Sequence, residues 1–335
     1  MCVRQLLLFG CLVVATSLGL AARESVAPKD FLWRTTGPAP SPKENPATAE
    51  KVELGKQLFF DPRLSGNNKI SCATCHDPKK AFADGLSRGK GISGKPLPRN
   101  TPSLLNVGFY KTLHWDGKVR SLEEQALLPI QHPDEMGQNL DELEAELNAV
   151  PGYVNQFQKV FGTKVTRTGI AQALAAFQRT LVTGKSPFDR YLEGDKKALS
   201  PLALEGMRIF FGPAECSRCH SGPFFTDQQF YRVGASFRDP GRENITGKKE
   251  DRFAFRTPTL RNIALTPPYM HDGSARSLHS VVTFYYRDVP TKAPLGLEMH
   301  ILPLMGQSLN DVAPLVAFLE SLTGPMPEIE PPKLP

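Results

Sequence analysis

The sequence has few of the features that would place a protein in a membrane, on nucleic acid or in a disulfide framework. Of its 335 residues only six are cysteine and two are tryptophan. The apolar run from Leu6 to Leu20 is short for a membrane span, and no later stretch is long enough for one. The formal net charge is only +6, and the basic residues are scattered. We therefore expect no nucleic-acid partner and no membrane span in the mature chain.

The N-terminal apolar run is typical of a secretion leader. Arg4 precedes it, and the small residues Gly19 and Ala21 fit a cleavage site just before Ala22. An uncleaved anchor is one alternative, and a lipoprotein acylated at Cys11 is another, although apolar residues continue past that cysteine. We predict a cleaved signal peptide over residues 1–21, export to the periplasm, and an extended Pro-rich segment over residues 22–46.

The cysteines that remain after the leader carry the clearest chemical signal. They stand in two motifs, Cys72, Cys75 and His76, then Cys216, Cys219 and His220. In an exported chain, Cys-x-x-Cys-His is the attachment pattern of c-type haem, in which the histidine reaches the iron. A zinc site or two redox disulfides are alternatives, but neither requires histidine after both pairs. The sequence therefore predicts two covalently bound haem c groups with His76 and His220 as iron ligands.

The two halves of the chain repeat the same order of motifs. "GKQLFF" precedes the first haem motif, and "GMRIFF" precedes the second. Further on, "RNTPSLLNVGFYKTLHWDG" is answered by "RTPTLRNIALTPPYMHDG", which matches Asn106 to Asn262 at one constant offset without a gap. We predict an internal duplication, with an N-terminal haem domain over residues 47–185, a C-terminal haem domain over 186–325 and a tail over 326–335.

Hydrophobic periodicity indicates a helical protein. Helices are expected over residues 49–59, 122–128, 140–149, 167–182, 201–211, 278–286 and 308–322. No convincing series of alternating strands appears, and residues 182–200 are typical of a linker. The predicted fold class is all-α, with two cytochrome c-like haem domains and long loops.

Several motifs together resemble one family. The two haem motifs, the stretches "RNTPSLLNV", "WDG" and "LRNIALTPPYMHDG", and the final "VAFLESLTG" are similar to those of the bacterial di-haem cytochrome c peroxidases and their relative MauG. The resemblance implies a peroxide-reactive N-terminal haem, an electron-transferring C-terminal haem and a calcium ion near the interface. It also implies that Trp115 stands between the haems and that Asn100, Thr266 and Pro268 bind the calcium.

The first haem is expected to have an open face. Peroxide chemistry needs a vacant iron position and a group that moves a proton between the peroxide oxygens. The loop over residues 77–98 contains no His and no Met, whereas family peroxidases that need reductive activation carry a closing histidine there. The family pattern implies that Gln125 and Glu135 line the peroxide pocket, with Glu135 as acid and base. A solvated surface acid is the alternative for Glu135, and His132 is a rival catalytic group.

The second haem is expected to have a closed face. The constant offset matches Pro129 of the first half to Tyr285 of the second. Proline cannot ligate iron, whereas a tyrosine hydroxyl can. The family peroxidases carry methionine at this position and MauG carries tyrosine. We predict Tyr285 as an axial ligand that gives the second haem a low potential. A core role for Tyr285 is the alternative, and the weaker candidate ligands are Tyr286, Met299 and Met305.

The predicted function is that of a periplasmic di-haem peroxidase. It would reduce hydrogen peroxide at the N-terminal haem with electrons from a small cytochrome c or copper protein, passed through the C-terminal haem. One alternative is a MauG-like enzyme that uses peroxide to oxidise residues of a partner protein. The non-enzymatic alternative is a di-haem electron-transfer cytochrome, which would need both irons closed.

Overall fold

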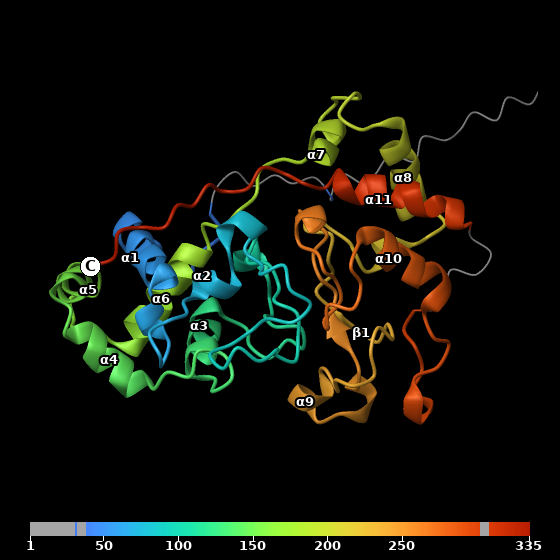
Figure 1. The fold of residues 1–335 in the computed structure, drawn as a ribbon. Helices are drawn as coiled ribbons and strands as arrows, with labels where there is room; N and C mark the ends of the chain where they lie inside the picture. The colour runs from blue at the N-terminus through green and yellow to red at the C-terminus, as the bar shows by residue number, and fades with distance from the viewer. Residues whose placement is uncertain (1–30, 32–37, 302–307) are drawn as a thin grey trace, which may run out of the picture.

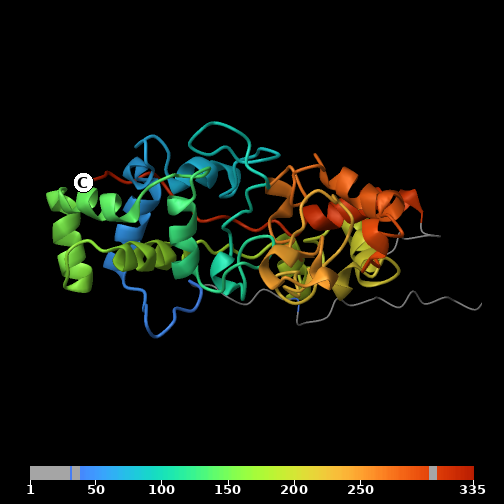
Figure 2. The same cartoon turned by 90° about the horizontal axis from the view of Figure 1, so that it is seen from below.

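The computed structural model describes residue 31 and residues 38–301 and 308–335 of the chain. These residues form two lobes that lie side by side in both ribbon views (Figures 1 and 2). The lobes are mostly helical, and the named strands are β1 (Phe230–Tyr231) and β2 (Phe255–Arg256), which pair antiparallel. The expectation of a mostly helical chain is thus confirmed.

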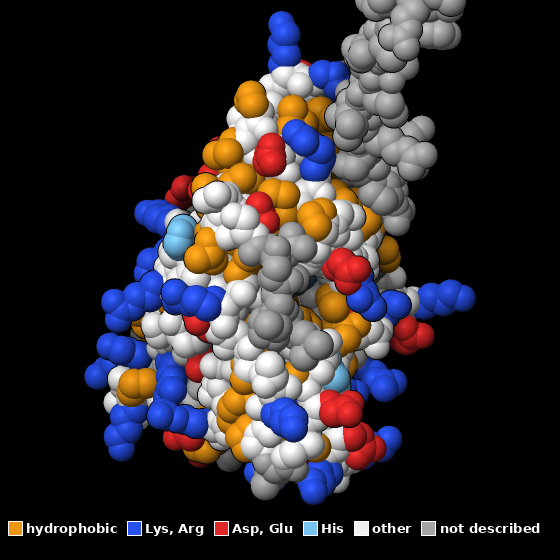
Figure 3. Space-filling view, turned by 90° about the vertical axis from the view of Figure 1, so that its right-hand side faces the viewer, with side chains coloured by type: hydrophobic (Ala, Val, Ile, Leu, Met, Phe, Trp, Pro, Cys, Tyr) orange, Lys and Arg blue, Asp and Glu red, His pale blue; other side chains and the backbone are white. Residues whose placement is uncertain are grey.

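The predicted leader lies outside the described residues, as does most of the segment over residues 22–46. Within the described ranges, no helix is long and apolar enough to cross a membrane. On the face shown in Figure 3, Lys and Arg side chains alternate with acidic and hydrophobic ones.

The N-terminal lobe is built on a pair of packed helices. Its helices are α1 (Ala49–Phe60), α2 (Cys72–Cys75), α3 (Leu122–Gln131), α4 (Leu140–Asn148), α5 (Pro151–Phe161) and α6 (Arg167–Gln178). Helices α1 and α6 make the most extensive contact in this lobe, and α3 packs on α6. Leu54, Leu58, Phe59 and Phe177 are fully or almost fully buried in the shared core.

The C-terminal lobe repeats this plan. Its helices are α7 (Pro187–Leu192), α8 (Pro201–Phe211), α9 (Glu243–Thr246), α10 (Leu278–Thr283) and α11 (Val312–Glu320). Helices α8 and α11 are the central pair, and their core contains the buried rings of Phe188, Phe210, Phe225 and Phe318. Helix α10 continues as a π-helix over Phe284–Asp288.

One glycine in each half allows the central helices to approach closely. A Cβ atom placed on Gly55 of α1 would lie 1.9 Å from the carbonyl oxygen of Ala173 in α6. A Cβ atom on Gly206 of α8 would lie 1.9 Å from the carbonyl oxygen of Pro314 in α11. These glycines begin the repeated "GKQLFF" and "GMRIFF" stretches. In both stretches the glycine lies where the backbones of two helices are in contact, and a larger residue would not fit there.

The loops between the helices also match. Asn106 and Asn262 both adopt left-handed conformations, with φ of 61° and 57°, and each precedes a short 3-10 helix. Their side chains bind the segments that follow the last helices of their halves. Asn106 Nδ2 donates to Thr183 Oγ1 at 3.1 Å, and Asn262 Nδ2 donates to the Gly324 carbonyl at 2.8 Å.

A reciprocal pair of backbone hydrogen bonds joins the lobes. The N–H of Arg256 donates to the carbonyl of Trp115 at 2.8 Å, and the N–H of Asn100 donates to the carbonyl of His271 at 2.8 Å. The constant sequence offset matches Asn100 to Arg256 and Trp115 to His271. The same bond is therefore made twice, once from each half, as in the contact of a two-fold dimer.

The last residues of the chain return to the N-terminal lobe. Gly184 N donates to the Pro325 carbonyl at 2.8 Å, and the side chains of Met326 and Ile329 pack against the N-terminal core. Arg63 Nη2 reaches the Pro335 oxygen at 3.2 Å. Figure 1 shows this segment crossing from α11 to a C-terminus beside α5. The predicted tail is thus extended, and it contacts the N-terminal lobe through Met326, Ile329 and Pro335.

Some helices were not predicted, and some predicted helix limits were wrong. Helix α5 was not predicted, although Pro151 at its start and the left-handed Gly162 at its end are ordinary helix signals. The segment read as a linker contains α7, which begins with a capping box of Ser186 and Asp189. The predicted helix over residues 167–182 ends at Gln178.

The close approach at Gly206 leads to a stability prediction. We expect Gly206→Ala to lower the free energy of unfolding by about 1–3 kcal/mol, because the added methyl group has no room and forces the α8–α11 pair apart. Thermal unfolding of the purified protein measures this. Glu205→Ala, at the neighbouring exposed position, is the control and is expected to change stability by less than about 0.5 kcal/mol. Equal stability of the two variants would contradict the packing argument.

Candidate haem sites and the cavity between the lobes

The first Cys-x-x-Cys-His motif forms a short helix. Ser71 and Thr74 make a capping box at the start of α2, and the N–H of His76 donates to the Cys72 carbonyl at 2.9 Å. His76 Nδ1 lies 3.0 Å from the carbonyl oxygen of Phe82. Because a carbonyl oxygen only accepts, Nδ1 carries the hydrogen and Nε2 keeps its lone pair for a metal. Burial lowers the pKa of His76, which favours this neutral form.

The second motif has the same internal geometry. The N–H of His220 donates to the Cys216 carbonyl at 3.0 Å, and His220 Nδ1 lies 3.0 Å from the carbonyl oxygen of Phe225. Burial lowers the pKa of His220 as well. Both histidines are therefore held by a backbone carbonyl in the tautomer that can ligate iron through Nε2.

The cysteines fit thioether attachment better than the alternatives. None of the four described cysteines is paired in a disulfide. Burial raises the pKa of Cys72 to about 12, so this thiol is neutral at ordinary pH. Among the described residues, no group of three or more His, Cys, Asp and Glu side chains is arranged to hold a metal ion. A zinc site built from both motifs and a disulfide in either motif therefore find no support in the structure.

His220 and Tyr285 line one large cavity. Its atom-free space, counted together with the part that is open to solvent, is about 1490 Å³, and its walls come from both lobes. Tyr285 lies in the π-helix that follows α10, a local widening of the helix that is frequent at functional sites. Burial, with added effects from Cys216 and Cys219, raises the pKa of Tyr285. The hydroxyl therefore lies close to the second haem motif.

The rival ligands for the second site are less well placed. The hydroxyl of Tyr286 is 3.1 Å from Asp311 Oδ2 and donates to it. Met299 belongs to a small separate cluster with Phe253 and Ala293. Met305 lies outside the described residues. Tyr285 remains the predicted ligand, and Tyr286 has a different partner.

The predicted acid–base residue lies near the first motif. Gln125 and Pro129 are one turn apart on α3, and the Pro129 carbonyl accepts from the N–H of Met136 at 3.1 Å, which places Glu135 beside this helix. Burial, then the charges of Asp84 and Glu135, raises the pKa of Cys75 to about 11. Glu135 is therefore within electrostatic reach of the first haem motif.

Glu135 is half-buried, which distinguishes it from its exposed neighbours. Burial is the main cause that raises the pKa of Glu135 above its usual 4.5, opposed by His132 and Lys118. Asp134 and His132 are exposed, and the His132 ring accepts from the N–H of Asp134 at 3.2 Å. His132 thus caps the turn from the outside.

The loop without His or Met lies against the Glu135 turn. Ile92 N donates to the Glu135 carbonyl at 2.7 Å, and Cys75 Sγ lies 3.8 Å from the Lys90 carbonyl. A Cβ atom on Gly91 would lie 1.7 Å from the Asp134 carbonyl oxygen, so only glycine fits there. The loop therefore connects the first haem motif to Glu135 and brings no iron ligand with it.

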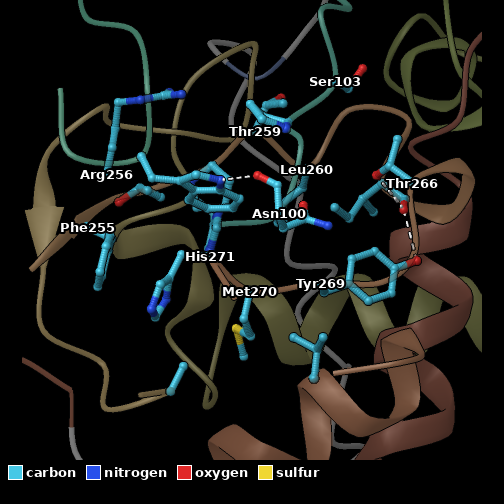
Figure 4. Close-up of a pocket in the computed structure, with 18 of the residues that line it drawn as sticks. Asn100, Ser103, Phe255, Arg256, Thr259, Leu260, Thr266, Tyr269, Met270 and His271 are labelled. Atoms are coloured by element: carbon cyan, nitrogen blue, oxygen red, sulfur yellow. Dashed lines mark hydrogen bonds between the residues drawn. The ribbon is translucent and has the colours of Figure 1, made fainter. Parts of the chain in front are cut away.

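Trp115 occupies the boundary between the lobes. Its Nε1 donates to the Asn100 carbonyl at 2.9 Å, the contact marked by a dashed line in Figure 4. Trp115 and the three predicted calcium ligands, Asn100, Thr266 and Pro268, all line the cavity that also holds His220. Asn100 Nδ2 donates to the Leu86 carbonyl at 2.9 Å.

Sequence reasoning missed a group of polar side chains in this cavity. Arg256 Nη1, His114 Nε2 and His271 Nε2 are buried and have no hydrogen-bond partner in the described part of the chain. The one available signal was the repeat itself, because Arg256 stands where the first half has the neutral Asn100.

Comparison with known proteins decides the family. The chain is 41% identical over 330 residues to "Methylamine utilization protein MauG" of Methylorubrum extorquens, covering 97% of this chain and 93% of that protein. The chain belongs to the di-haem cytochrome c peroxidase family. The family profile described as "Di-haem cytochrome c peroxidase" matches residues 49–197.

Further relatives of the family agree. "Cytochrome c551 peroxidase" of Nitrosomonas europaea is 39% identical, covering 87% of this chain and 85% of that protein. A crystal structure of "a MauG-like protein associated with microbial copper homeostasis" is 33% identical, covers 89% of this chain and 95% of that one, and has a TM-score of 0.79. Family membership makes this protein an oxidoreductase that acts on peroxide and implies two haem c groups.

The attachment residues lead to a prediction about cofactor content. We expect the double variant Cys216→Ser, Cys219→Ser to carry one covalent haem in place of two, because only the first motif can still form thioethers. The pyridine haemochrome spectrum per mole of protein measures the content. Retention of two covalent haems would contradict the assignment. Arg276→Gln, at an exposed position outside both motifs, is a control with unchanged haem content.

Proposed function

We propose that this protein is a periplasmic peroxidase that reduces hydrogen peroxide at the N-terminal haem site with electrons that pass through the C-terminal site. The observation that carries the proposal is the difference between equivalent positions. The first half has Pro129 on α3, and the second half has Tyr285 on the π-helix after α10. At this position, only the second half therefore offers a side chain that could bind the haem iron as a second protein ligand.

We infer that the two lobes arose by internal duplication, with haem domains over residues 47–185 and 186–325. The matched glycines Gly55 and Gly206 and the matched left-handed Asn106 and Asn262 support this. The reciprocal hydrogen bonds across the interface support it further, since they pair equivalent positions. The predicted signal peptide over residues 1–21 would carry the chain to the periplasm.

Haem c, which His76 would hold, would supply the iron chemistry of peroxide reduction. Glu135 supplies the proton transfer. Its carboxylate would accept a proton from hydrogen peroxide and return it to the leaving oxygen. The Gln125 amide, on the same face of α3 as Pro129, would donate a hydrogen bond that orients the peroxide. The half-buried position of Glu135 keeps competing water away from the carboxylate.

Trp115 and Tyr285 would serve the electron route. The indole of Trp115 is fixed by its hydrogen bond to the Asn100 carbonyl and lies at the boundary between the two haem sites. The phenol oxygen of Tyr285 would hold the iron of the second haem together with His220, since both residues line the same cavity. The donor would be a small cytochrome c or copper protein. A calcium ion held by Asn100, Thr266 and Pro268 would stabilise this region through neutral oxygen ligands.

One observation favours a second candidate function, the MauG-like oxidation of a partner protein's residues. A hard phenolate oxygen stabilises oxidised iron, so Tyr285 would make the second site a poor acceptor from ordinary cytochromes. The absence of His and Met from residues 77–98 points the same way. A plain electron-transfer cytochrome is disfavoured, because residues 77–98 contain no His or Met that could serve as a second ligand of the first haem.

The role of Glu135 leads to a rate prediction. We expect Glu135→Gln to slow the reaction with hydrogen peroxide by about 10²–10⁴-fold, because the amide cannot accept the proton. Stopped-flow mixing of the resting enzyme with peroxide measures the rate. In the wild type the rate falls as the pH drops through the raised pKa of Glu135, because the carboxylate is lost, and this acid limb disappears in the variant.

Asp134→Asn is the matched control for Glu135. Asp134 is the exposed acid beside it, so we expect a rate within about threefold of the wild type because its charge is screened by solvent. Equal losses in both variants, or a Glu135→Gln enzyme with an intact acid limb, would remove Glu135 from the mechanism.

The role of Tyr285 leads to a spectroscopic prediction. We expect Tyr285→Met to raise the reduction potential of the C-terminal haem and to increase turnover with a reduced cytochrome c, because a thioether favours reduced iron. Tyr285→Phe keeps the ring and its packing but removes the oxygen. The electron paramagnetic resonance signal of the C-terminal haem reports the ligand. An unchanged low-spin signal in the Phe variant would exclude Tyr285 as a ligand.

A further inference from the structure

Arg256 is a buried cation that forms no ion pair with any described residue of the protein. It lies on β2, where its backbone N–H is used in the bond to Trp115. Its Nη1 is buried without a hydrogen-bond partner, and its Nε makes one long contact of 3.5 Å to the His114 carbonyl. The guanidinium lies over the ring of Tyr110, 5.0 Å from its centroid. This is a cation–π contact, and the tyrosine brings no negative charge to it.

No carboxylate of the described residues forms an ion pair with Arg256. Burial lowers the pKa of Arg256, and among the described groups only Tyr110 opposes this effect. Nearby arginines differ. Arg99 binds Asp116 and Asp239 at 2.6 Å each, and the buried Arg261 binds Asp189. Because an unpaired buried charge is strongly unfavourable, the guanidinium of Arg256 calls for an anion from outside the chain.

The wall around Arg256 offers a second unused donor. His114 lines the same cavity, and its Nε2 is buried without a partner in the described residues. Burial is the main cause that lowers the pKa of His114, so its ring is neutral and can donate one N–H. The carbonyl of His114 already contacts Arg256, which brings the two residues together.

The site belongs to one half of the molecule only. The residue equivalent to Arg256 in the first half is Asn100, whose side chain donates to the Leu86 carbonyl. The two matched positions therefore differ in charge, because Arg256 is a cation and Asn100 is neutral. Figure 4 shows Arg256 in the same pocket as Asn100 and His271.

We propose that Arg256, assisted by His114, binds a carboxylate at the wall of the cavity between the lobes. A guanidinium presents parallel N–H groups that match a carboxylate in geometry and charge. Two sources share this chemistry, a propionate of the haem attached at His220 and a free small carboxylate that enters the cavity. The first source rests on the haem content in the proposed function.

The sign of a stability change tests the site in the holoprotein. Arg256→Met removes the charge but keeps a long side chain. With a carboxylate bound, the variant leaves that anion buried and unpaired, so we expect a lower Tm than the wild type. Without a ligand, the change removes a buried unpaired cation, and an equal or higher Tm overturns the proposal. Arg208→Gln, on the exposed side of α8, is the control with unchanged Tm.

Reduction potentials and added formate separate the two sources. A haem propionate predicts that the midpoint potential of one haem falls in Arg256→Met and that formate, at constant ionic strength, has no effect on the wild type. A free carboxylate predicts that formate raises the Tm of the wild type and not that of Arg256→Met. Unchanged potentials together with no response to formate overturn both.

The charge-conserving variant protects the test against misfolding. If Arg256→Met yields no holoprotein, Arg256→Lys decides, because it keeps the cation without the planar fork. Potentials close to those of the wild type support the site, and a Tm above the wild type overturns it. None of these measurements uses peroxide turnover, so failure of the proposed peroxidase activity would be seen separately.

Discussion

The arrangement of both haem sites depends on the reciprocal hydrogen bonds between Arg256 and Trp115 and between Asn100 and His271. Each bond is worth only about 0.5–1.5 kcal/mol net, but a buried N–H left without its partner would cost more. Because the two bonds join equivalent positions, they fix the angle between the lobes as well as their contact. Trp115 is held at this contact between the lobes by its carbonyl, which accepts from the N–H of Arg256, and by its indole N–H, which donates to the Asn100 carbonyl.

Two similar lobes with a few different side chains would allow one fold to host the two different irons of the proposed function. The proximal histidines are equivalent, and each is oriented by a backbone carbonyl at 3.0 Å. The differences lie on the opposite faces, where Pro129 is matched by Tyr285. The contact between the lobes also has different side chains at matched positions, since Trp115 is matched by His271. The proposed difference between the halves therefore rests on side chains at matched positions, together with the π-helix that carries Tyr285 in the second half.

Much of this could be predicted from sequence, for reasons that differ between residues. The haem motifs have a fixed spacing because two thioethers and one axial histidine must meet one porphyrin, and the repeat shows which positions are equivalent. Helix α7 was missed because Ser186, Pro187 and Asp189 are equally common in loops. The placement of Glu135 beside Cys75 could not be read from spacing, since it depends on contacts with a loop more than thirty residues away. The missing partner of Arg256 is likewise a property of its surroundings.

The return of the chain end to the N-terminal lobe has a consequence for how the molecule is made. Domains emerge and begin to fold from the N-terminus during synthesis. Met326 and Ile329, which pack on the core of the first lobe, follow the whole of the second lobe in the chain. The core of the first lobe is thus completed only after the second lobe has been synthesised. Any extension fused to Pro335 would begin beside α5, on the surface of the opposite half from the helix that precedes it in the chain.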